Sequence, residues 1–254
     1  MVHLLPLPGS PRFDGSMSEV LETAISDAST LHDAGFPSLL VENFGDAPFR
    51  ADRVDPETIA GLTLAVEAVM TATGLPVGVN VLRNDAISAL GIAAVTGARF
   101  IRVNVLTGVM NTDQGPIVGR AAELLRKRRE LGLDVEIWAD VMVKHATPPP
   151  GLEPGQAALD TVERGLAVAV IVSGSGTGAE PDIEVAREVR SALPKGTRVV
   201  VGSGANVGNL SRLVEIADTV IVGSGIKVDN DASNRVDEAK AAAFIEASAD
   251  AGLL

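Results

Sequence analysis

A small set of charged and amide side chains ends several apolar runs of this chain. Carboxylates can move protons, lysine can bind an anion or attack a carbonyl, and arginine and asparagine can orient a polar ligand. Such groups are costly to bury unless they are paired or bind something. The pattern predicts either a ligand site or an internal network, for example an ion pair of Arg102 with Glu42 or Asp140. The set consists of Asn80, Arg102, Asn104, Lys144 and the two carboxylates Glu42 and Asp140.

The two carboxylates and the lysine are the most reactive members of this set. Asp140 is the first choice as a general base, or as the residue that orients one, because it ends a predicted strand. Glu42 is the second choice. Lys144 is either a Schiff-base amine or anion clamp, or simply a solvated loop lysine. His3 is more typical of a hydrogen-bonded core histidine than of a catalyst.

Three glycine-serine loops follow short apolar runs late in the chain, at 173–178, 202–204 and 223–225. Backbone N–H groups in loops of this kind can hold a phosphate. Lys227 could add a positive charge to the same anion. The alternative is a set of tight turns into helices, because glycine tolerates positive φ and serine caps helices. The predicted phosphate donors are Gly176, Thr177, Gly202, Ser203, Gly204, Gly223, Ser224 and Gly225.

Strands and helices alternate along the whole chain in the pattern of hydrophobic residues. β-branched runs predict eight strands, at 2–5, 38–42, 76–80, 100–104, 135–140, 167–172, 198–201 and 219–222. Helical periodicity separates them, at 18–35, 55–73, 85–97, 116–131, 155–165, 181–193, 206–216 and 235–251. Asp113 is expected to cap the helix that starts at Pro116. Eight such units in 254 residues predict an α/β fold, the (β/α)₈ TIM barrel, with an open doubly wound sheet as the alternative.

Composition favours one globular domain over residues 1–254. Hydrophobic residues make up 46% of the chain, and no linker divides it. No apolar run approaches the roughly 18 residues of a membrane span, and no signal peptide opens the sequence, so a cytoplasmic location is expected. The absence of cysteine excludes thiolate catalysis and disulfides. No histidine pair has metal-ligand spacing, whereas Mg²⁺ held by carboxylates stays open.

The net charge of −12 with an isoelectric point of about 4.7 narrows the choice of partner. Nucleic acid and an anionic membrane surface are both disfavoured, because both are polyanions. A small phosphorylated ligand remains compatible through local N–H groups. The acidic, arginine-rich composition is typical of a salt-adapted or high-GC organism, or else of an ordinary acidic cytosolic enzyme. A homo-oligomer is also compatible with the sequence.

Several ordered motifs, spread over nearly the whole chain, resemble the BtpA/SgcQ family. They stand at 1–11, 41–49, 77–85, 100–104, 139–146 and 173–178, and include the sequences VENFGDAPF and SGSGTG. The resemblance implies a barrel enzyme of unsettled activity, similar to the phosphate-binding barrels. It also brings associations with photosystem I biogenesis in cyanobacteria and with sugar-metabolism operons.

Two hypotheses follow from these observations. The first is an enzyme acting on a small phosphorylated sugar or nucleoside, either by proton transfer beside a carbonyl, as in an isomerase or lyase, or by cleavage of an N-glycosidic bond. In the cleavage, Asp140 or Glu42 would support oxocarbenium character. The second is a non-catalytic assembly or stability factor of the photosystem I biogenesis type. It predicts a large exposed apolar patch and a mouth whose polar groups satisfy one another.

Overall fold

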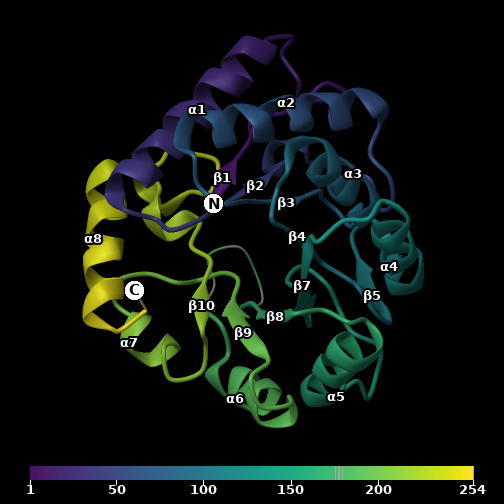
Figure 1. Cartoon of the computed structure of the whole chain (residues 1–254). Helices are drawn as coiled ribbons and strands as arrows, with labels where there is room; N and C mark the ends of the chain where they lie inside the picture. Colours follow the sequence, from purple (N-terminus) through teal and green to yellow (C-terminus); the bar gives the residue numbers. More distant parts are fainter. Residues whose placement is uncertain (175, 177, 179, 254) are drawn as a thin grey trace.

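Eight parallel strands curl into one sheet in the computed structural model, which describes residues 1–174, 176, 178 and 180–253 (Figure 1). The main-chain nitrogen of Met1 donates to the Val222 oxygen at 2.9 Å and joins the two ends of the sheet. This arrangement confirms the predicted TIM-barrel fold. In spatial order the strands are β1 (Val2–His3), β2 (Leu39–Glu42), β3 (Val77–Asn80), β4 (Phe100–Val103), β7 (Glu136–Val141), β8 (Ala169–Val172), β9 (Arg198–Val201) and β10 (Thr219–Val220).

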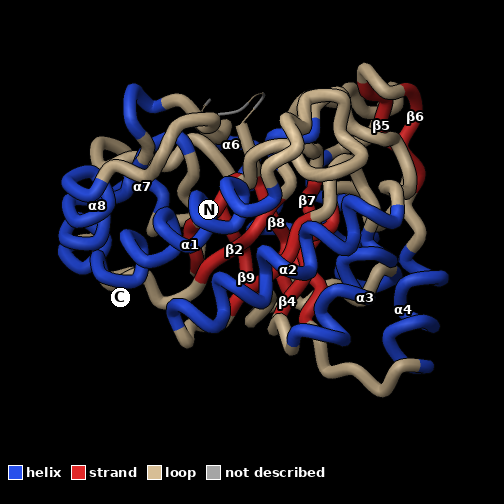
Figure 2. The backbone as a smooth tube through the Cα atoms, turned by 90° about the horizontal axis from the view of Figure 1, so that it is seen from above, coloured by secondary structure: helices blue, strands red, loops and turns tan. Residues whose placement is uncertain are grey.

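Helices surround the sheet on its outer side (Figures 1 and 2). Asp182 and Asp237 cap the starts of α6 (Ile183–Ala192) and α8 (Glu238–Asp250) with their carboxylates. Gly35 ends α1 (Met17–Ala34) at a φ of 97°, a value that suits glycine. None of the described helices is both long and apolar enough to cross a membrane. The helices are α1 (Met17–Ala34), α2 (Pro56–Thr73), α3 (Ala86–Thr96), α4 (Ala121–Glu130), α5 (Pro154–Leu159), α6 (Ile183–Ala192), α7 (Leu210–Leu213) and α8 (Glu238–Asp250).

A β-hairpin lies where the sequence pattern predicts the start of the fourth helix. Strands β5 (Val109–Thr112) and β6 (Gly115–Val118) pair antiparallel, and α4 begins only at Ala121. Asp113 therefore sits in the hairpin turn, so its prediction as a helix cap is wrong. Met110 and Ile117 bury their side chains in a small apolar cluster below the hairpin, and this long-range packing outweighs the local preference of Pro116 for a helix start.

The inside of the barrel is apolar at one end and polar at the other. Alternate residues of each strand point inward, so Phe100 and Trp138 stack at 4.2 Å between ring centroids, and Arg102 and Asp140 come two residues later. Gly78 makes room for the ring of Phe100, because a Cβ at position 78 would lie 2.2 Å from Phe100 Cε2. The polar layer is therefore at the carboxyl ends of the strands, where barrels carry their chemistry.

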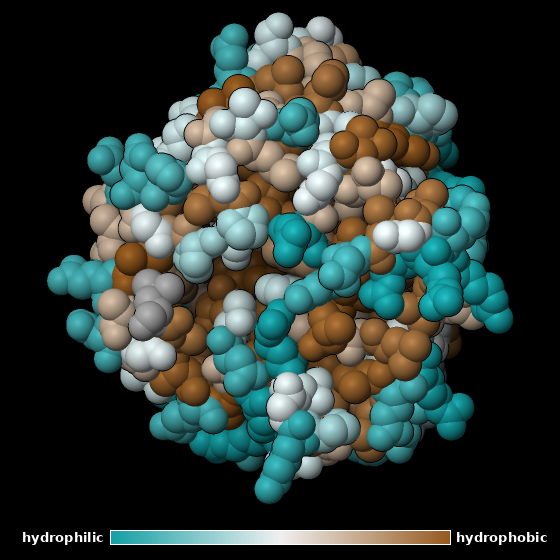
Figure 3. All heavy atoms as spheres, viewed as in Figure 1, coloured by the Kyte–Doolittle hydropathy of each residue, from teal (hydrophilic) through white to brown (hydrophobic). Residues whose placement is uncertain are grey.

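Polar and charged side chains dominate the rim of the face viewed in Figure 3, while apolar atoms are visible nearer its centre. Large apolar residues are nevertheless exposed at two neighbouring helices: Leu64 on α2 is 54% exposed and Val95 on α3 is 78% exposed.

Candidate functional site

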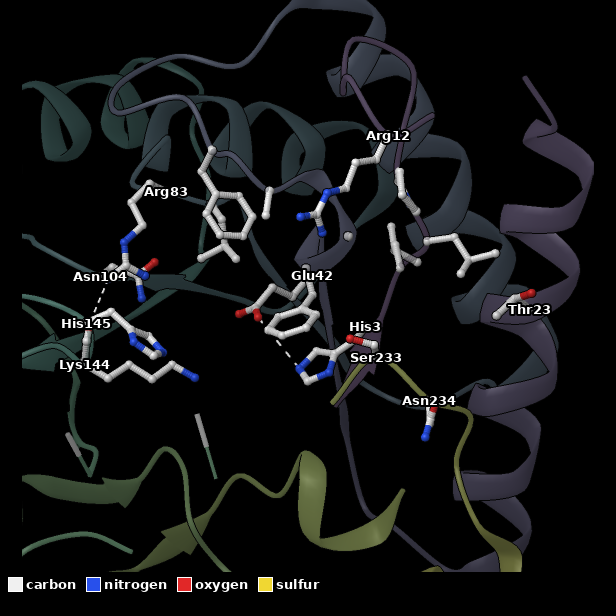
Figure 4. Close-up of a pocket in the computed structure, with 18 of the residues that line it drawn as sticks. His3, Arg12, Thr23, Glu42, Arg83, Asn104, Lys144, His145, Ser233 and Asn234 are labelled. Atoms are coloured by element: carbon white, nitrogen blue, oxygen red, sulfur yellow. Dashed lines mark hydrogen bonds and ion pairs between the residues drawn. The ribbon is translucent and has the colours of Figure 1, made fainter. Parts of the chain in front are cut away.

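A cavity of about 690 Å³ opens at the carboxyl ends of the first strands (Figure 4). A smaller one of about 20 Å³ lies against the glycine loops that follow β9 and β10. His3, Glu42 and Lys144 line both cavities. These three residues therefore stand at the junction between a large chamber and the loops predicted to hold a phosphate.

Arg102 and Asp140 form a buried bidentate ion pair at the bottom of the mouth. Arg102 Nε and Nη2 donate to the two Asp140 oxygens at 2.9 and 2.8 Å, and Asn104 Nδ2 donates to the same carboxylate at 3.3 Å. Burial alone lowers the pKa of Arg102, but the ion pair with Asp140 outweighs it and raises this pKa above its ordinary value. This is the internal pairing that the sequence left open as an alternative.

This ion pair changes which of the two carboxylates, Asp140 or Glu42, is the first choice as a general base. The Asp140 side chain is fully buried, and hydrogen bonds reach both of its oxygens, including a long one of 3.4 Å from Ser173. Hydrogen-bond donors of the protein therefore already occupy both oxygens of this carboxylate. Because the Asp140 carboxylate is already paired with Arg102, Glu42 is the stronger candidate for a base, and Asp140 is a candidate for positioning Arg102.

Glu42 is 4% exposed, yet no group in the described part of the chain donates a hydrogen bond to its carboxylate. Its recorded contact is with His3, whose Nε2 lies 3.7 Å from Glu42 Oε1, too far for a hydrogen bond. The Glu42 oxygens are not among the fully buried atoms without a partner, so they open onto the cavity, where water or a ligand can supply a donor. The Glu42 carboxylate thus faces the cavity without a hydrogen-bond donor from the described residues.

His3 is held in one tautomer beside Glu42. A carbonyl oxygen only accepts, so His3 Nδ1 carries the proton donated to Ala232 O at 2.9 Å, and the ring stacks on Phe44 at 4.5 Å. Burial is the main cause that lowers the pKa of His3 well below its ordinary value, followed by the positive charge of Lys227. His3 therefore stays neutral, with the lone pair of Nε2 directed toward the site.

This lowered pKa predicts a loss of stability in acid. The unfolded chain takes up a proton on His3 as the pH falls below about 6.5, whereas the folded protein does not until a lower pH is reached. In that window the free energy of unfolding should fall with decreasing pH, by up to about 1.4 kcal/mol per pH unit for this one proton. His3→Gln should remove this contribution to the pH dependence of the free energy of unfolding. Urea denaturation at a series of pH values below about 6.5 measures it.

His32→Gln is the matched control, because His32 lies on the surface beside Asp33. Its slope gives the effect of removing an exposed histidine, and the His3→Gln slope is compared with it. A His3→Gln protein with the same acid slope as wild type would show that the buried imidazole does not titrate as argued.

Lys144 lies in the loop after β7, and its side chain extends toward Glu42 (Figure 4). The backbone of this loop is held by Arg83, whose Nη2 donates to Lys144 O at 2.6 Å. Burial lowers the pKa of Lys144, with a further lowering by Arg102. No hydrogen bond or ion pair is recorded for its ammonium group among the described residues. Lys144 is therefore available to a ligand rather than tied into the wall.

Asn80 and Asn104 come together as the strand register predicts. Asn80 Nδ2 donates at 3.1 Å to both Arg102 O and Asn104 Oδ1. These bonds orient Asn104 toward Asp140 and support the buried ion pair. Asn80 Oδ1 is buried without a hydrogen-bond partner within the described ranges.

The glycine loops present several backbone N–H groups at the small cavity. Gly204 adopts a φ of 76°, and the loops after β8 and β10 touch, since a Cβ on Gly178 would lie 3.0 Å from Ser224 Oγ. Of the predicted donors, Thr177 lies outside the described residues. The following N–H groups donate to no acceptor in the described ranges: Ser203, Gly204, Gly223, Ser224 and Gly225.

Two predictions about this region need correction. The Gly202 N–H donates to Val172 O at 2.8 Å, so it belongs to the sheet rather than to an anion site. Gly202 is needed for space instead, because a Cβ there would lie 2.3 Å from Ile171 Cγ2. Lys227 is 1% exposed, and its ammonium donates to Asp27 at 3.1 Å and to Asn234 O at 2.7 Å, so it does not reach the anion site.

The wall of the large cavity also contains residues that the sequence did not single out. Arg12 and Phe49 come from long loops after β1 and β2, and Asp27 comes from the inner side of α1. Asp27 fixes the segment that forms another part of the wall by accepting from Arg235 Nε at 2.8 Å. Phe49 ends the motif at 41–49, but nothing in that motif indicated a place in a cavity wall. Asp27 could not have been found from the sequence, because its contact with Lys227 spans 200 positions of the chain.

Across residues 1–174, 176, 178 and 180–253, no three or more histidine and carboxylate side chains are grouped so that they could hold a metal ion.

Solved structures with a similar fold include two proteins named for phosphorylated compounds. Thiamine phosphate pyrophosphorylase from Pyrococcus furiosus is 10% identical with a TM-score of 0.60, over 91% of this chain and 92% of that one. Orotidine 5'-phosphate decarboxylase from Pyrococcus horikoshii is 20% identical with a TM-score of 0.59, over 89% of this chain and 93% of that one. At these identities the likeness concerns the fold.

Sequence relatives are much closer. The photosystem I biogenesis protein BtpA of Synechocystis is 50% identical over 98% of this chain and 87% of its own. The putative sgc region protein SgcQ of Escherichia coli is 29% identical over 97% of this chain and 91% of its own. The model of the BtpA family matches residues 1–250. The chain therefore belongs to the BtpA family, as its motifs indicate.

Proposed function

We propose that this protein is an enzyme that binds a small phosphorylated carbonyl compound and moves a proton on the carbon next to the carbonyl. The observation that carries the proposal is Glu42, a buried carboxylate without a hydrogen-bond donor, at the junction of the cavity and the glycine loops. The phosphate would bind to the N–H groups of Ser203, Gly204, Ser224 and Gly225. This is the place where barrels commonly hold phosphate.

The chemistry follows from the two reactive groups. Glu42 takes a proton from the carbon beside the carbonyl, and the electron pair left behind moves onto the carbonyl oxygen. The Lys144 ammonium donates to that oxygen as its charge grows. In an isomerisation of a hydroxy carbonyl compound, Glu42 returns the proton to the former carbonyl carbon, and the hydroxyl of the α-carbon gives its proton to the neutral Lys144 amine as the new carbonyl forms. In a lyase reaction, the electron pair on the oxygen re-forms the carbonyl and a leaving group departs from the β-carbon. The lowered pKa of Lys144 makes it a ready proton donor.

The charge of the mouth favours this chemistry over cleavage of an N-glycosidic bond. After Arg102 and Asp140 neutralise each other, Arg83 and Lys144 face Glu42. Such a set stabilises a developing oxyanion and opposes a positively charged oxocarbenium ion. Glycoside cleavage also uses two carboxylates as a rule, and here only Glu42 is unpaired within the described mouth.

A charge placed in the loop after β10 tests the phosphate site. Ser224→Asp puts a carboxylate among the proposed donors and should abolish the rise in melting temperature that inorganic phosphate or a sugar phosphate gives to the wild-type protein. Ser191→Asp, on the exposed side of α6, makes the same chemical change away from the site and should keep the full response. Equal responses of both variants in a thermal-shift assay would contradict the proposal.

A role in assembly is the second candidate, because the Synechocystis relative is named for photosystem I biogenesis. The exposed Leu64 and Val95 on neighbouring helices are the structural feature that favours it. The mouth is less favourable to this candidate, since Glu42 and Lys144 do not satisfy each other as a purely structural mouth would. The enzyme is therefore the proposal that the described contacts support better.

A further inference from the structure

Two arginines are buried at the mouth, and their surroundings differ. Arg102 is 2% exposed and forms the bidentate ion pair with Asp140. Arg83 is 4% exposed, but its guanidinium makes one hydrogen bond, to Lys144 O at 2.6 Å. No carboxylate of the described chain lies within ion-pair distance of Arg83. One buried guanidinium is thus fully matched, whereas the other keeps most of its donors unused.

An unmatched buried cation is costly, so its presence calls for a reason. Burial is the main cause that lowers the pKa of Arg83, and the negative charges of Asp140, Glu42 and Asp113 only partly offset it. A guanidinium presents several donors in a planar fork, which fits the two oxygens of a carboxylate or phosphate. Arg83 therefore lacks an anionic partner among the described residues and is arranged to pair with an anionic group of a ligand.

Arg83 lines the large cavity rather than the small one at the glycine loops. It follows β3, and Arg12 extends its guanidinium into the same chamber from the loop after β1 (Figure 4). No ion pair is recorded for Arg12 in the described part of the protein. Glu42 and Lys144 stand between this arginine side and the glycine loops, since they line both cavities.

We propose that Arg83, assisted by Arg12, receives a second anionic group of the ligand, a carboxylate or a phosphate. The substrate is then a phosphorylated compound with an acidic group at its other end, and its reacting carbons lie between the two anions beside Glu42 and Lys144. This assignment rests on the proposed function for the phosphate end. The second anionic group would also occupy part of the large cavity of about 690 Å³, which a phosphate bound in the small cavity would leave empty.

Matched six-carbon probes test this assignment by calorimetry. Glucitol 6-phosphate carries one anion, 6-phosphogluconate adds a carboxylate, and glucitol 1,6-bisphosphate adds a phosphate. The wild-type protein should bind at least one of the two doubly anionic probes about tenfold or more tightly than glucitol 6-phosphate, as expected for charge-assisted hydrogen bonds. The preferred probe identifies the second group as carboxylate or phosphate. Arg83→Met should remove the preference, and Arg83→Lys should keep part of it.

The possible results separate this inference from the proposed function. Equal affinity for the three probes, or a preference that survives in Arg83→Met, would overturn the second anion site while leaving the phosphate site in place. Failure of all three probes and of inorganic phosphate to bind would overturn both.

Stability measurements without ligand give an independent test. Removing an unmatched buried cation relieves its cost and offsets the lost hydrogen bond to Lys144 O, so Arg83→Met should melt close to the wild-type temperature. Arg102→Met, which leaves Asp140 unpaired, should melt well below it. A fall in Arg83→Met as large as that in Arg102→Met would show that Arg83 is a structural residue and would contradict the inference.

Discussion

Replacing Arg102 with methionine is expected to lower the free energy of unfolding by about 3–5 kcal/mol, because it leaves the buried Asp140 carboxylate without its partner. Urea denaturation of the variant and the wild type measures this difference. The two groups are almost fully buried and share two hydrogen bonds of 2.8 and 2.9 Å, so water cannot replace the guanidinium without opening the mouth.

The double variant Arg102→Met, Asp140→Leu is the informative control. It removes both charges, and much of the lost stability should return, because a buried ion pair replaced by apolar groups of similar volume is often neutral. The surface pair of Arg53 with Glu123 offers a comparison, since Arg53→Met should cost at most about 1 kcal/mol. A cost for Arg102→Met as small as that for Arg53→Met would mean that the interior pair is not formed in solution.

Changing Glu42 to glutamine is expected to slow proton exchange on a phosphorylated carbonyl substrate by about 100- to 10,000-fold. The amide has nearly the shape of the carboxylate but cannot accept the proton. Nuclear magnetic resonance in deuterated water measures the exchange for a panel that includes dihydroxyacetone phosphate and ribose 5-phosphate. Inorganic phosphate should still raise the melting temperature of this variant, because the glycine loops are unchanged.

Glu57→Gln is the control for this experiment, because Glu57 lies exposed at the start of α2. It removes one negative charge, as the Glu42 change does, and should leave exchange untouched. If Glu42→Gln keeps the wild-type exchange rate while Asp140→Asn alone abolishes it, the paired carboxylate is the base and the assignment made here is wrong.

The fold was accessible from the sequence because its evidence is local and repeated. Each β-branched run predicts a strand, and each helical stretch predicts a helix, without information from the rest of the chain. Eight successive strand–helix units then favour a barrel. The hairpin β5–β6 was missed for the opposite reason. Its stability comes from Met110 and Ile117 packing with Val105 and Val143, residues from other parts of the mouth, while Pro116 locally favours the start of a helix.

The candidate site was accessible only as a set of positions. Strand ends and the period of two place Glu42, Arg102 and Asp140 on the inner face of the barrel, as the structure has them. Which carboxylate pairs with Arg102 depends on tertiary distances between strands, which no spacing encodes. The same limit explains Lys227, whose partner Asp27 lies 200 residues away. The catalytic and phosphate-binding roles of these residues remain predictions.

A crystal structure of the protein grown with inorganic phosphate tests the central claim most directly. We expect one phosphate in the small cavity, with its oxygens about 2.7–3.1 Å from the main-chain nitrogens of Ser203, Gly204, Ser224 and Gly225, and with Glu42 and Lys144 beside it. Phosphate bound elsewhere on the molecule, with these N–H groups occupied by the protein's own carbonyl oxygens, would contradict it.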